Sequence, residues 1–228
     1  PFVSGKDSLN NEFSYDDADG NKQTISIPPS LLISAMGQIA DVATAVTMDA
    51  KQAGNIVFLV GATKRELGGS HLSLVHSLKG GEVPTVDSVQ AKKTFAKTHE
   101  AIQNGLLRSC HDLSEGGLAV AAAEMAMAGD LGMKMDLAAV RDESGHSAES
   151  RLSPTEALFS ESNTRFLVEV ETESADEFEG LLRGSAVPVF RLGTIESSAQ
   201  LAVTVGDQEV LDVDVAEAKA AWQKPLDW

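Results

Sequence analysis

Residues 110–129, CHDLSEGGLAVAAAEMAMAG, join a polar turn to an apolar, helix-forming stretch. Gly116 and Gly117 open that stretch. A helix N-terminus offers unpaired N–H groups and the positive end of the helix dipole, and glycines let a phosphate approach them. Just upstream, Asp112 supplies a carboxylate for Mg²⁺, and the Ser114 hydroxyl can bond a phosphate oxygen. The pattern predicts a site for a metal-bound polyphosphate.

The same residues also have a purely structural interpretation. Asp112 or Ser114 could do no more than cap the helix, and the two glycines could serve tight packing. A lone histidine beside a helix start, here His111, is more typical of a structural hydrogen bond than of a catalytic base. Spacing alone leaves both interpretations open.

A second candidate lies in residues 4–13, SGKDSLNNEF. Gly5, Lys6, Asp7 and Ser8 place a flexible turn, a cation, a carboxylate and a hydroxyl within four residues, a set that phosphate recognition uses. The stretch lacks the first glycine of the G-x-x-x-x-G-K-[ST] nucleotide loop. An ordinary surface turn is the alternative.

A third candidate is residues 158–166, LFSESNTRF, where Glu161, Ser162 and Asn163 directly precede a predicted strand. These side chains could bind a sugar or phosphate, although a polar loop explains them equally well. The sequence contains no nucleophile elbow and no histidine-pair metal motif. We expect the methionines of this half to fill the core: Met125, Met127, Met133 and Met135.

Hydrophobic patterning predicts the elements that position these candidates. Strands are expected over 30–41, 55–63, 132–137, 165–171, 188–196, 201–207 and 209–215. Helices are expected over 118–128, ending at Gly129, and over short stretches beginning near 154, 174 and 216. A long amphipathic helix should follow a cap at Asp87, with its apolar positions at Val89, Phe95, Ile102 and Leu106.

The order of these elements indicates the fold class. Strands and helices alternate, but the late strands follow one another through short turns. This order favours an α+β fold, an α/β sandwich with a mixed β-sheet flanked by helices, over a purely parallel doubly wound fold. Residues 1–24 look irregular, with an exposed turn in SYDDADGNKQT, and Pro28 and Pro29 mark a boundary.

Composition limits the partners and the compartment. The 228 residues carry a formal charge of −16, which argues against a nucleic-acid partner because phosphate binding needs clustered Lys and Arg. We expect no membrane span and no signal peptide, and the single Cys110 excludes an internal disulfide. A reducing cytoplasm is the simplest location. The first residue is not Met, so we expect a piece of a longer chain.

The three candidates, in this order, resemble a known family. SGKDSLNNE, then CHDLSEGGLAVAAAEMA, then LFSESNTRFLVEV, with LGGSHL and the ending AWQKPLDW, is similar to the C-terminal part of the phosphoribosylformylglycinamidine synthase family. This family belongs to the aminoimidazole ribonucleotide synthetase superfamily. The resemblance implies that residues 1–28 are the tail of the second ATP-binding domain and that residues 29–228 form the C-terminal domain after it.

The resemblance also implies an activity in purine biosynthesis. The family uses ATP and Mg²⁺ to activate the amide oxygen of formylglycinamide ribonucleotide, and glutamine-derived ammonia then displaces the phosphate to give the amidine. The implied partners are the first half and second ATP-binding domain of the synthetase, and a glutamine amidotransferase subunit or domain. The catalytic residues are expected upstream of this chain, so we expect the chain alone to be inactive.

Site roles follow by position in the matching motifs. ATP or ADP would contact Gly5, Lys6 and Ser114, together with Gly116 and Gly117; substrate would contact Ser8, Glu161 and Ser162; Mg²⁺ would bind Asp112. Some family members have Asn as a metal ligand where Lys6 stands, but a lysine cannot ligate Mg²⁺ and is expected to touch phosphate instead. A non-catalytic nucleotide-binding or interaction module is the alternative. The SGKDSLNNE motif argues against relatives with other substrates, such as hydrogenase-maturation or selenophosphate-forming enzymes.

Overall fold

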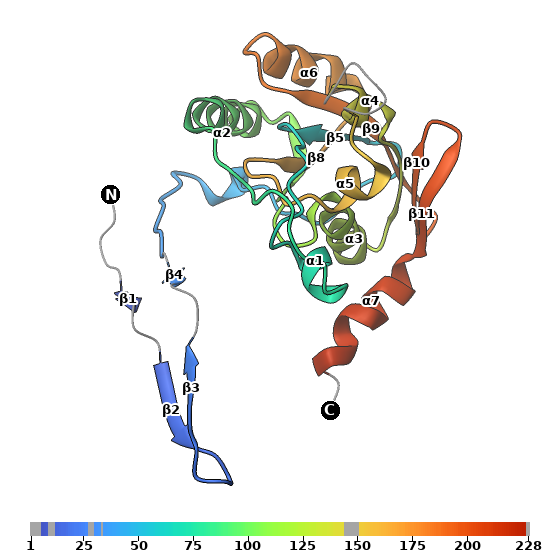
Figure 1. Cartoon of the computed structure of the whole chain (residues 1–228). Helices are drawn as coiled ribbons and strands as arrows, with labels where there is room; N and C mark the ends of the chain where they lie inside the picture. The colour runs from blue at the N-terminus through green and yellow to red at the C-terminus, as the bar shows by residue number, and fades with distance from the viewer. Residues whose placement is uncertain (1–5, 9–11, 27–29, 33, 144–150, 227–228) are drawn as a thin grey trace. The chain divides into compact units, whose positions relative to one another are not determined.

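The computed structural model describes residues 6–8, 12–26, 30–32, 34–143 and 151–226. The chain divides into two compact units, Pro1–Val42 and Ala43–Trp228 (Figure 1). Pro28 and Pro29, the predicted boundary, lie outside the described residues, and their positions fall within the span of the first unit. The domain assignment made from the resemblance therefore stays a prediction.

The first unit contains two small antiparallel ladders. They are β1 (Lys6–Ser8) with β4 (Ser30–Leu32), and β2 (Glu12–Asp16) with β3 (Lys22–Ser26). The turn between β2 and β3 is confirmed: an Asp17 carboxylate oxygen accepts from the N–H groups of Asp19 (3.0 Å) and Asn21 (2.8 Å). The expectation of irregular structure around it is wrong, because the flanking residues pair as a hairpin.

The predicted buried strand over residues 30–41 is also wrong. Among the described residues of this range, only Ser30–Leu32 forms a strand, and Met36 and Ile39 are 92% and 57% exposed. Two-stranded ladders offer no broad sheet face against which an apolar run could be buried. Hydrophobic content alone therefore gave a misleading prediction for this stretch.

The second unit is built on a seven-stranded sheet of order β11-β10-β7-β9-β5-β8-β6. Its strands are β5 (Ile56–Val60), β6 (Leu107–Asp112), β7 (Gly132–Asp136), β8 (Phe166–Val170), β9 (Val189–Glu196), β10 (Gln200–Val205) and β11 (Gln208–Asp214). Strands β7 and β10 pair in parallel, and the other ladders are antiparallel. The predicted mixed sheet is confirmed.

Most helices lie where local patterning predicts them, but the helix over residues 138–143 was not predicted. They are α1 (His71–Val75), α2 (Ser88–Gln103), α3 (Gly117–Gly129), α4 (Ala138–Glu143), α5 (Pro154–Phe159), α6 (Ala175–Arg183) and α7 (Val215–Gln223). Short 3₁₀ turns add Val42–Thr44, Thr172–Ser174 and Lys224–Leu226. Within the described ranges, we find no helix with the length and apolar character needed to cross a bilayer.

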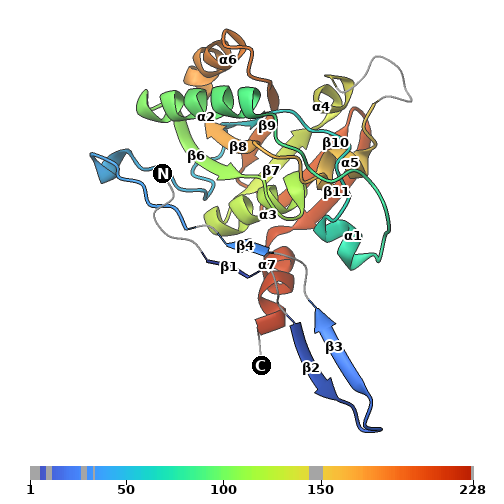
Figure 2. The ribbon, with the colours of Figure 1, turned by 60° about the vertical axis from the view of Figure 1, so that its left-hand side comes forward.

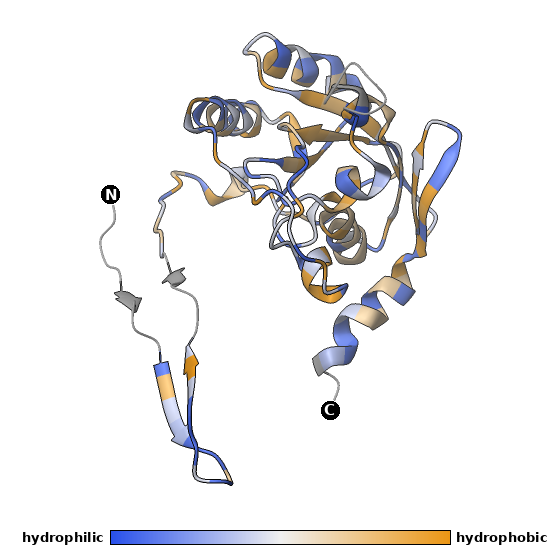
Figure 3. Cartoon of the chain, viewed as in Figure 1, coloured by the Kyte–Doolittle hydropathy of each residue, from blue (hydrophilic) through white to orange (hydrophobic). Residues whose placement is uncertain are grey.

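Two apolar clusters lie on the two faces of this sheet. Helices α2 and α6 lie over one face and α3 over the other (Figure 2). Successive side chains of β5 point to opposite faces of the sheet. Val57 and Leu59 belong to the cluster that includes residues of α3, and Phe58 belongs to the cluster that includes Phe178 of α6. Figure 3 shows this unit's apolar residues gathered along its inner strands. The core role expected for the methionines is confirmed, since Met125, Met133 and Met135 are buried there and Met127 packs against them.

Helix α2 faces the core differently from the prediction. Val89 and Phe95 are 67% and 53% exposed, and the buried face is Ala91, Thr94, Thr98 and Ala101. Small side chains at these positions allow the helix to approach its neighbours closely. Val89 and Phe95 are therefore left on the outer side of α2, whereas the predicted positions Ile102 and Leu106 do pack in the core.

Candidate functional site

A pocket of about 440 Å³ lies beside the ends of β6 and β8 in the second unit. It is lined by Pro84, Phe95, residues 112–115, Glu161 and residues 163–166. Asp112 ends β6 opposite Phe166, the first residue of β8, so the sheet register fixes two sides of the pocket. The structure thus brings together three predicted site residues from two separate segments: Asp112 and Ser114 from one, and Glu161 from the other.

The rim of the pocket is acidic. The Asp112 side chain is 69% exposed, and Glu115 is exposed beside it. The pKa of Glu115 lies below its usual value because its own backbone N–H and then the Ser114 hydroxyl bond the carboxylate, with a weaker contribution from His71. Glu115 therefore stays negative at neutral pH, and Ser114 already has a partner in the turn.

Glu161 ties the beginnings of two helices together. Its Oε1 accepts the backbone N–H of His71 and that of Gly116, both at 2.8 Å, and lies 3.5 Å from Nδ1 of His71. The Glu161 side chain is 15% exposed, so these bonds are partly shielded from water. The carboxylate thus occupies a place beside α3 that an anionic ligand would otherwise take.

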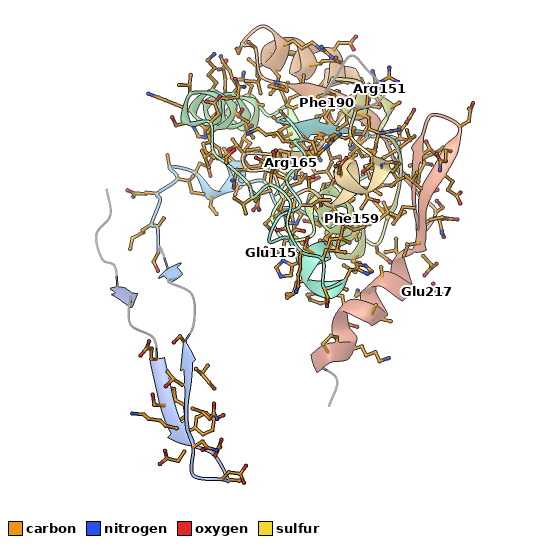
Figure 4. All side chains as sticks on the ribbon, viewed as in Figure 1. Glu115, Arg151, Phe159, Arg165, Phe190 and Glu217 are labelled. Atoms are coloured by element: carbon orange, nitrogen blue, oxygen red, sulfur yellow. The ribbon has the colours of Figure 1, made fainter. Side chains whose placement is uncertain are left out.

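Arg165 lies beneath this rim, in the packed interior that Figure 4 shows, and is 1% exposed. Its Nε donates to the Ser162 carbonyl at 2.9 Å, its Nη1 to the Thr63 hydroxyl at 3.0 Å, and its Nη2 to the Ser160 carbonyl. Burial lowers the pKa of Arg165 to about 10, against the opposing effect of nearby carboxylates. The side chain therefore keeps its positive charge at neutral pH.

The loop above Arg165 has an unusual backbone. Thr164 has φ of 64°, a left-handed conformation that β-branched residues rarely adopt. A Cβ added to Gly61 would lie 2.4 Å from the Thr164 carbonyl oxygen, so Gly61 leaves room for that carbonyl. The shape of this wall is held by its neighbours rather than by local preference.

The structure corrects the role expected of the Gly116 and Gly117 amides. Gly116 N–H donates to Glu161, and Gly117 N–H donates to the Ser114 carbonyl at 3.1 Å, so neither amide is free for phosphate. Their φ values are +78° and +63°, and a Cβ on Gly117 would lie 2.5 Å from the Ser160 carbonyl oxygen. The packing interpretation explains these glycines. The described residues place no side-chain cap at Gly116, so Asp112 and Ser114 do not cap α3 either.

Two further residues from the sequence analysis, Ser162 and His111, are not among those that line the pocket. Ser162 is buried, and its hydroxyl accepts the Lys64 N–H at 3.0 Å, which leaves it badly placed for a substrate. His111 has its Nε2 2.7 Å from Oε2 of Glu124, in agreement with a structural histidine. Gly5 lies outside the described residues, and β1 defines only the backbone of Lys6 and Ser8. The roles of these last three stay predictions.

The donor set suits Mg²⁺ only together with a ligand. No cluster of three or more His, Cys, Asp or Glu side chains in the described part of the chain could hold a metal by itself. Mg²⁺ commonly takes one or two carboxylates and completes its shell with phosphate oxygens and water. The exposed Asp112 carboxylate fits that arrangement.

Sequence reasoning missed the apolar wall of the pocket. Phe95 lines it and contacts Phe166 edge to face, with ring centroids 5.9 Å apart. Helical periodicity assigned Phe95 to the core. The helical spacing of small residues in α2, which form its buried face, could have shown that Phe95 lies on the other side of the helix.

Similar proteins were found by sequence and by structure. The subunit PurL of phosphoribosylformylglycinamidine synthase from Alkaliphilus metalliredigens is 31% identical over 227 residues, which cover 99% of this chain and 28% of that protein. The Thermococcus sibiricus subunit PurL is 33% identical over 221 residues, covering 97% and 28%. This chain therefore spans little more than a quarter of the length of these relatives.

The structural similarity concerns the fold. Thermotoga maritima PurL complexed with FGAR has a TM-score of 0.66 at 23% identity, covering 78% of this chain and 30% of that one. The same protein complexed with ATP gives 0.63 at 22% identity, covering 78% and 27%. Residues 52–206 match the family described as AIR synthase related protein, C-terminal domain. The resemblance predicted from the motifs is thus confirmed, and the chain belongs to this AIR synthase related family.

Proposed function

We propose that this chain is the C-terminal part of a phosphoribosylformylglycinamidine synthase and that its pocket binds a Mg²⁺-complexed nucleotide. The whole protein would convert formylglycinamide ribonucleotide, with ATP and glutamine-derived ammonia, to the amidine. The observation that carries the proposal is the convergence of Asp112, Ser114 and Glu161 on one pocket. Sequence similarity to PurL subunits over nearly the whole chain supports the choice of reaction.

The acidic rim assigns separate roles to its residues. Asp112 would hold Mg²⁺ together with phosphate oxygens of the nucleotide, and the ion would neutralise phosphate charge next to Glu115 and Glu161. Ser114, although bonded to Glu115, stands in the exposed turn where its hydroxyl can exchange partners. A nucleotide without metal would meet three carboxylates, so binding should depend strongly on Mg²⁺.

The first unit supports a connection to a further domain. Phe13 and Ile25 are paired across the β2–β3 hairpin, and Phe13 and Tyr15 stack with centroids 5.8 Å apart. These three side chains are 65%, 54% and 42% exposed, on one face of a two-stranded ladder. We propose that other parts of a longer protein cover them, as the tail of a second ATP-binding domain would require. In that longer protein, Lys6 would contact the nucleotide and Ser8 the substrate.

The remaining proposals concern the whole protein. The expected partners are the rest of the synthetase and a glutamine amidotransferase, and the expected compartment is the cytoplasm. A structure of PurLQS from Thermotoga maritima is in keeping with such an assembly. The chain alone should be inactive, so ATP- and ammonia-dependent turnover by these 228 residues would contradict the proposal.

Calorimetric titration with Mg·ADP tests the pocket. We expect the chain to bind Mg·ADP, and Asp112→Asn to weaken binding about tenfold or more, because loss of a metal-ligating charge removes part of the Mg²⁺ shell. Asp41→Asn, a substitution in the first unit, is the control. Equal binding by Asp112→Asn and the parent chain would remove Asp112 from the metal site.

A non-catalytic interaction module is the second candidate. The observation in its favour is that the Gly116 and Gly117 amides are already bonded within the chain. No detectable Mg·ADP binding by the chain or by the longer protein that contains it would favour this module.

A further inference from the structure

We propose that Phe95 and Pro84 form the wall against which the base of a bound nucleotide stacks. This inference rests on the proposed nucleotide pocket and adds the part of the ligand that the pocket distinguishes. A nucleoside phosphate, rather than an inorganic phosphate, would then be the preferred class of ligand.

Phe95 is exposed without being needed for the core. Its side chain is 53% exposed, while the buried face of α2 is complete without it. An edge-to-face contact with Phe166, at an interplanar angle of 70°, fixes the orientation of the pair. Such a contact uses at most one face of the Phe95 ring, so a planar group can stack in the pocket without displacing Phe166.

The polar side of the pocket suits a nucleoside better than a bare phosphate. Asp112, Glu115 and Glu161 present carboxylates, which accept hydrogen bonds but repel anions. A nucleoside supplies donors, namely amino groups on the base and ribose hydroxyls. Its phosphates need only one Mg²⁺ at Asp112, whereas an inorganic phosphate gains nothing from the apolar wall.

The size of the pocket is in keeping with this ligand. At about 440 Å³ it falls within the roughly 300–1,000 Å³ that is usual for small-molecule sites. Apolar and acidic residues lie on different segments. Pro84 precedes α2 and Phe95 lies on it, whereas Asp112 ends β6, Glu115 lies in the turn before α3 and Glu161 in the loop before β8. A ligand with an aromatic end and a phosphate end matches that division.

Calorimetry on the 228-residue chain can separate the two ends of the ligand, with Mg·ADP and Mg·pyrophosphate as probes. We expect Phe95→Ala to weaken Mg·ADP binding about tenfold, since base stacking on an aromatic side chain contributes that much or more, and to leave Mg·pyrophosphate unchanged. Phe95→Leu keeps apolar bulk without the ring and should weaken Mg·ADP as well, whereas Phe95→Tyr should retain it. Val89→Ala is the matched control, because Val89 is exposed on the same helix outside this pocket.

The outcomes distinguish this inference from the proposed function. Mg·ADP binding that is equal in the parent chain, Phe95→Ala and Phe95→Leu would overturn the stacking wall and leave the nucleotide pocket standing. An equal loss of both probes in both variants would also overturn it, because the effect would not be specific to the base. If the parent chain binds neither probe, the nucleotide pocket itself is wrong.

Discussion

Two glutamates at opposite ends of the β6–β8 ladder use their carboxylates in different ways. Glu169 is fully buried opposite Ser109, and both of its oxygens are bonded: to the backbone N–H groups of Lys51 (2.8 Å) and Gln52 (3.0 Å), the Asn55 amide (2.6 Å) and the Ser109 hydroxyl (3.0 Å). Glu161 is partly exposed beside the pocket and accepts two backbone N–H groups through one oxygen.

The difference separates a structural site from a candidate binding site. Within the described part of the chain, both oxygens of the fully buried Glu169 accept hydrogen bonds from the protein, so this carboxylate holds residues 51–55 against the sheet. Glu161 also joins segments, but it does so at the edge of an open pocket. Burial together with complete hydrogen bonding, rather than charge alone, distinguishes the two.

The largest expected effect is that of Glu169→Ala. We expect the free energy of unfolding to fall by about 3–4 kcal/mol, because several buried donors lose their acceptor at once. Urea denaturation monitored by circular dichroism measures the change. Glu169→Gln keeps the shape and one acceptor oxygen and should cost less. A loss below about 1 kcal/mol for Glu169→Ala would mean that water reaches these donors.

Glu161→Ala should have an intermediate effect. We expect a loss of about 1–2 kcal/mol, because the Glu161 side chain is partly exposed and water can take the place of its oxygen at the His71 and Gly116 amides. The same denaturation measurement applies, with the exposed Glu209→Ala on β11 as a control that should change stability little. A loss as large as that of Glu169→Ala would erase the proposed distinction between the two carboxylates.

Sequence reasoning succeeded where the determining interactions are local. Asp87 caps α2 as predicted, with its carboxylate accepting from Val89 and Gln90 N–H at 3.0 Å each, and the Gly129 end of α3 was placed correctly. Strand β6 was missed because its polar residues look like part of a turn, and its partner β8 lies far along the chain.

In the pocket, too, side-chain chemistry could be predicted from the sequence but long-range contacts could not. Asp112, Ser114 and Glu161 could be selected from the chemistry of their side chains, and the structure places them together. Nothing in the local sequence shows that Glu161 reaches the Gly116 amide, or that Gly117 packs against the Ser160 carbonyl. Both contacts connect segments more than forty residues apart, so only the tertiary structure reveals them.

The smallest expected effect concerns Cys110, whose thiol can report on local opening between Glu169 and Glu161. It lies on β6 between Ser109, which bonds Glu169, and the pocket end of the strand, and its N–H donates to the Thr47 carbonyl at 3.1 Å. Burial, with a smaller contribution from Asp112, raises the pKa of its thiol to about 12 from 9.0. The folded state therefore keeps a proton that the unfolded state loses first.

The raised pKa of Cys110 contributes to the free energy of unfolding. That contribution is fully present below the pKa of the thiol in the unfolded state, and it is lost as the pH rises towards the pKa in the folded state. By pH 9 the loss relative to pH 7 should be roughly 0.4 kcal/mol, and Cys110→Ser should abolish that part of the pH dependence.

Because the thiolate is the reactive form, a thiol reagent at pH 8.5 should modify the native chain far more slowly than the urea-unfolded chain. Glu169→Ala should speed native-state modification by releasing residues 47–55, whereas Glu161→Ala should leave it unchanged. Equal acceleration in both variants would show that the two ends of the β6–β8 ladder open together, contrary to the division drawn here.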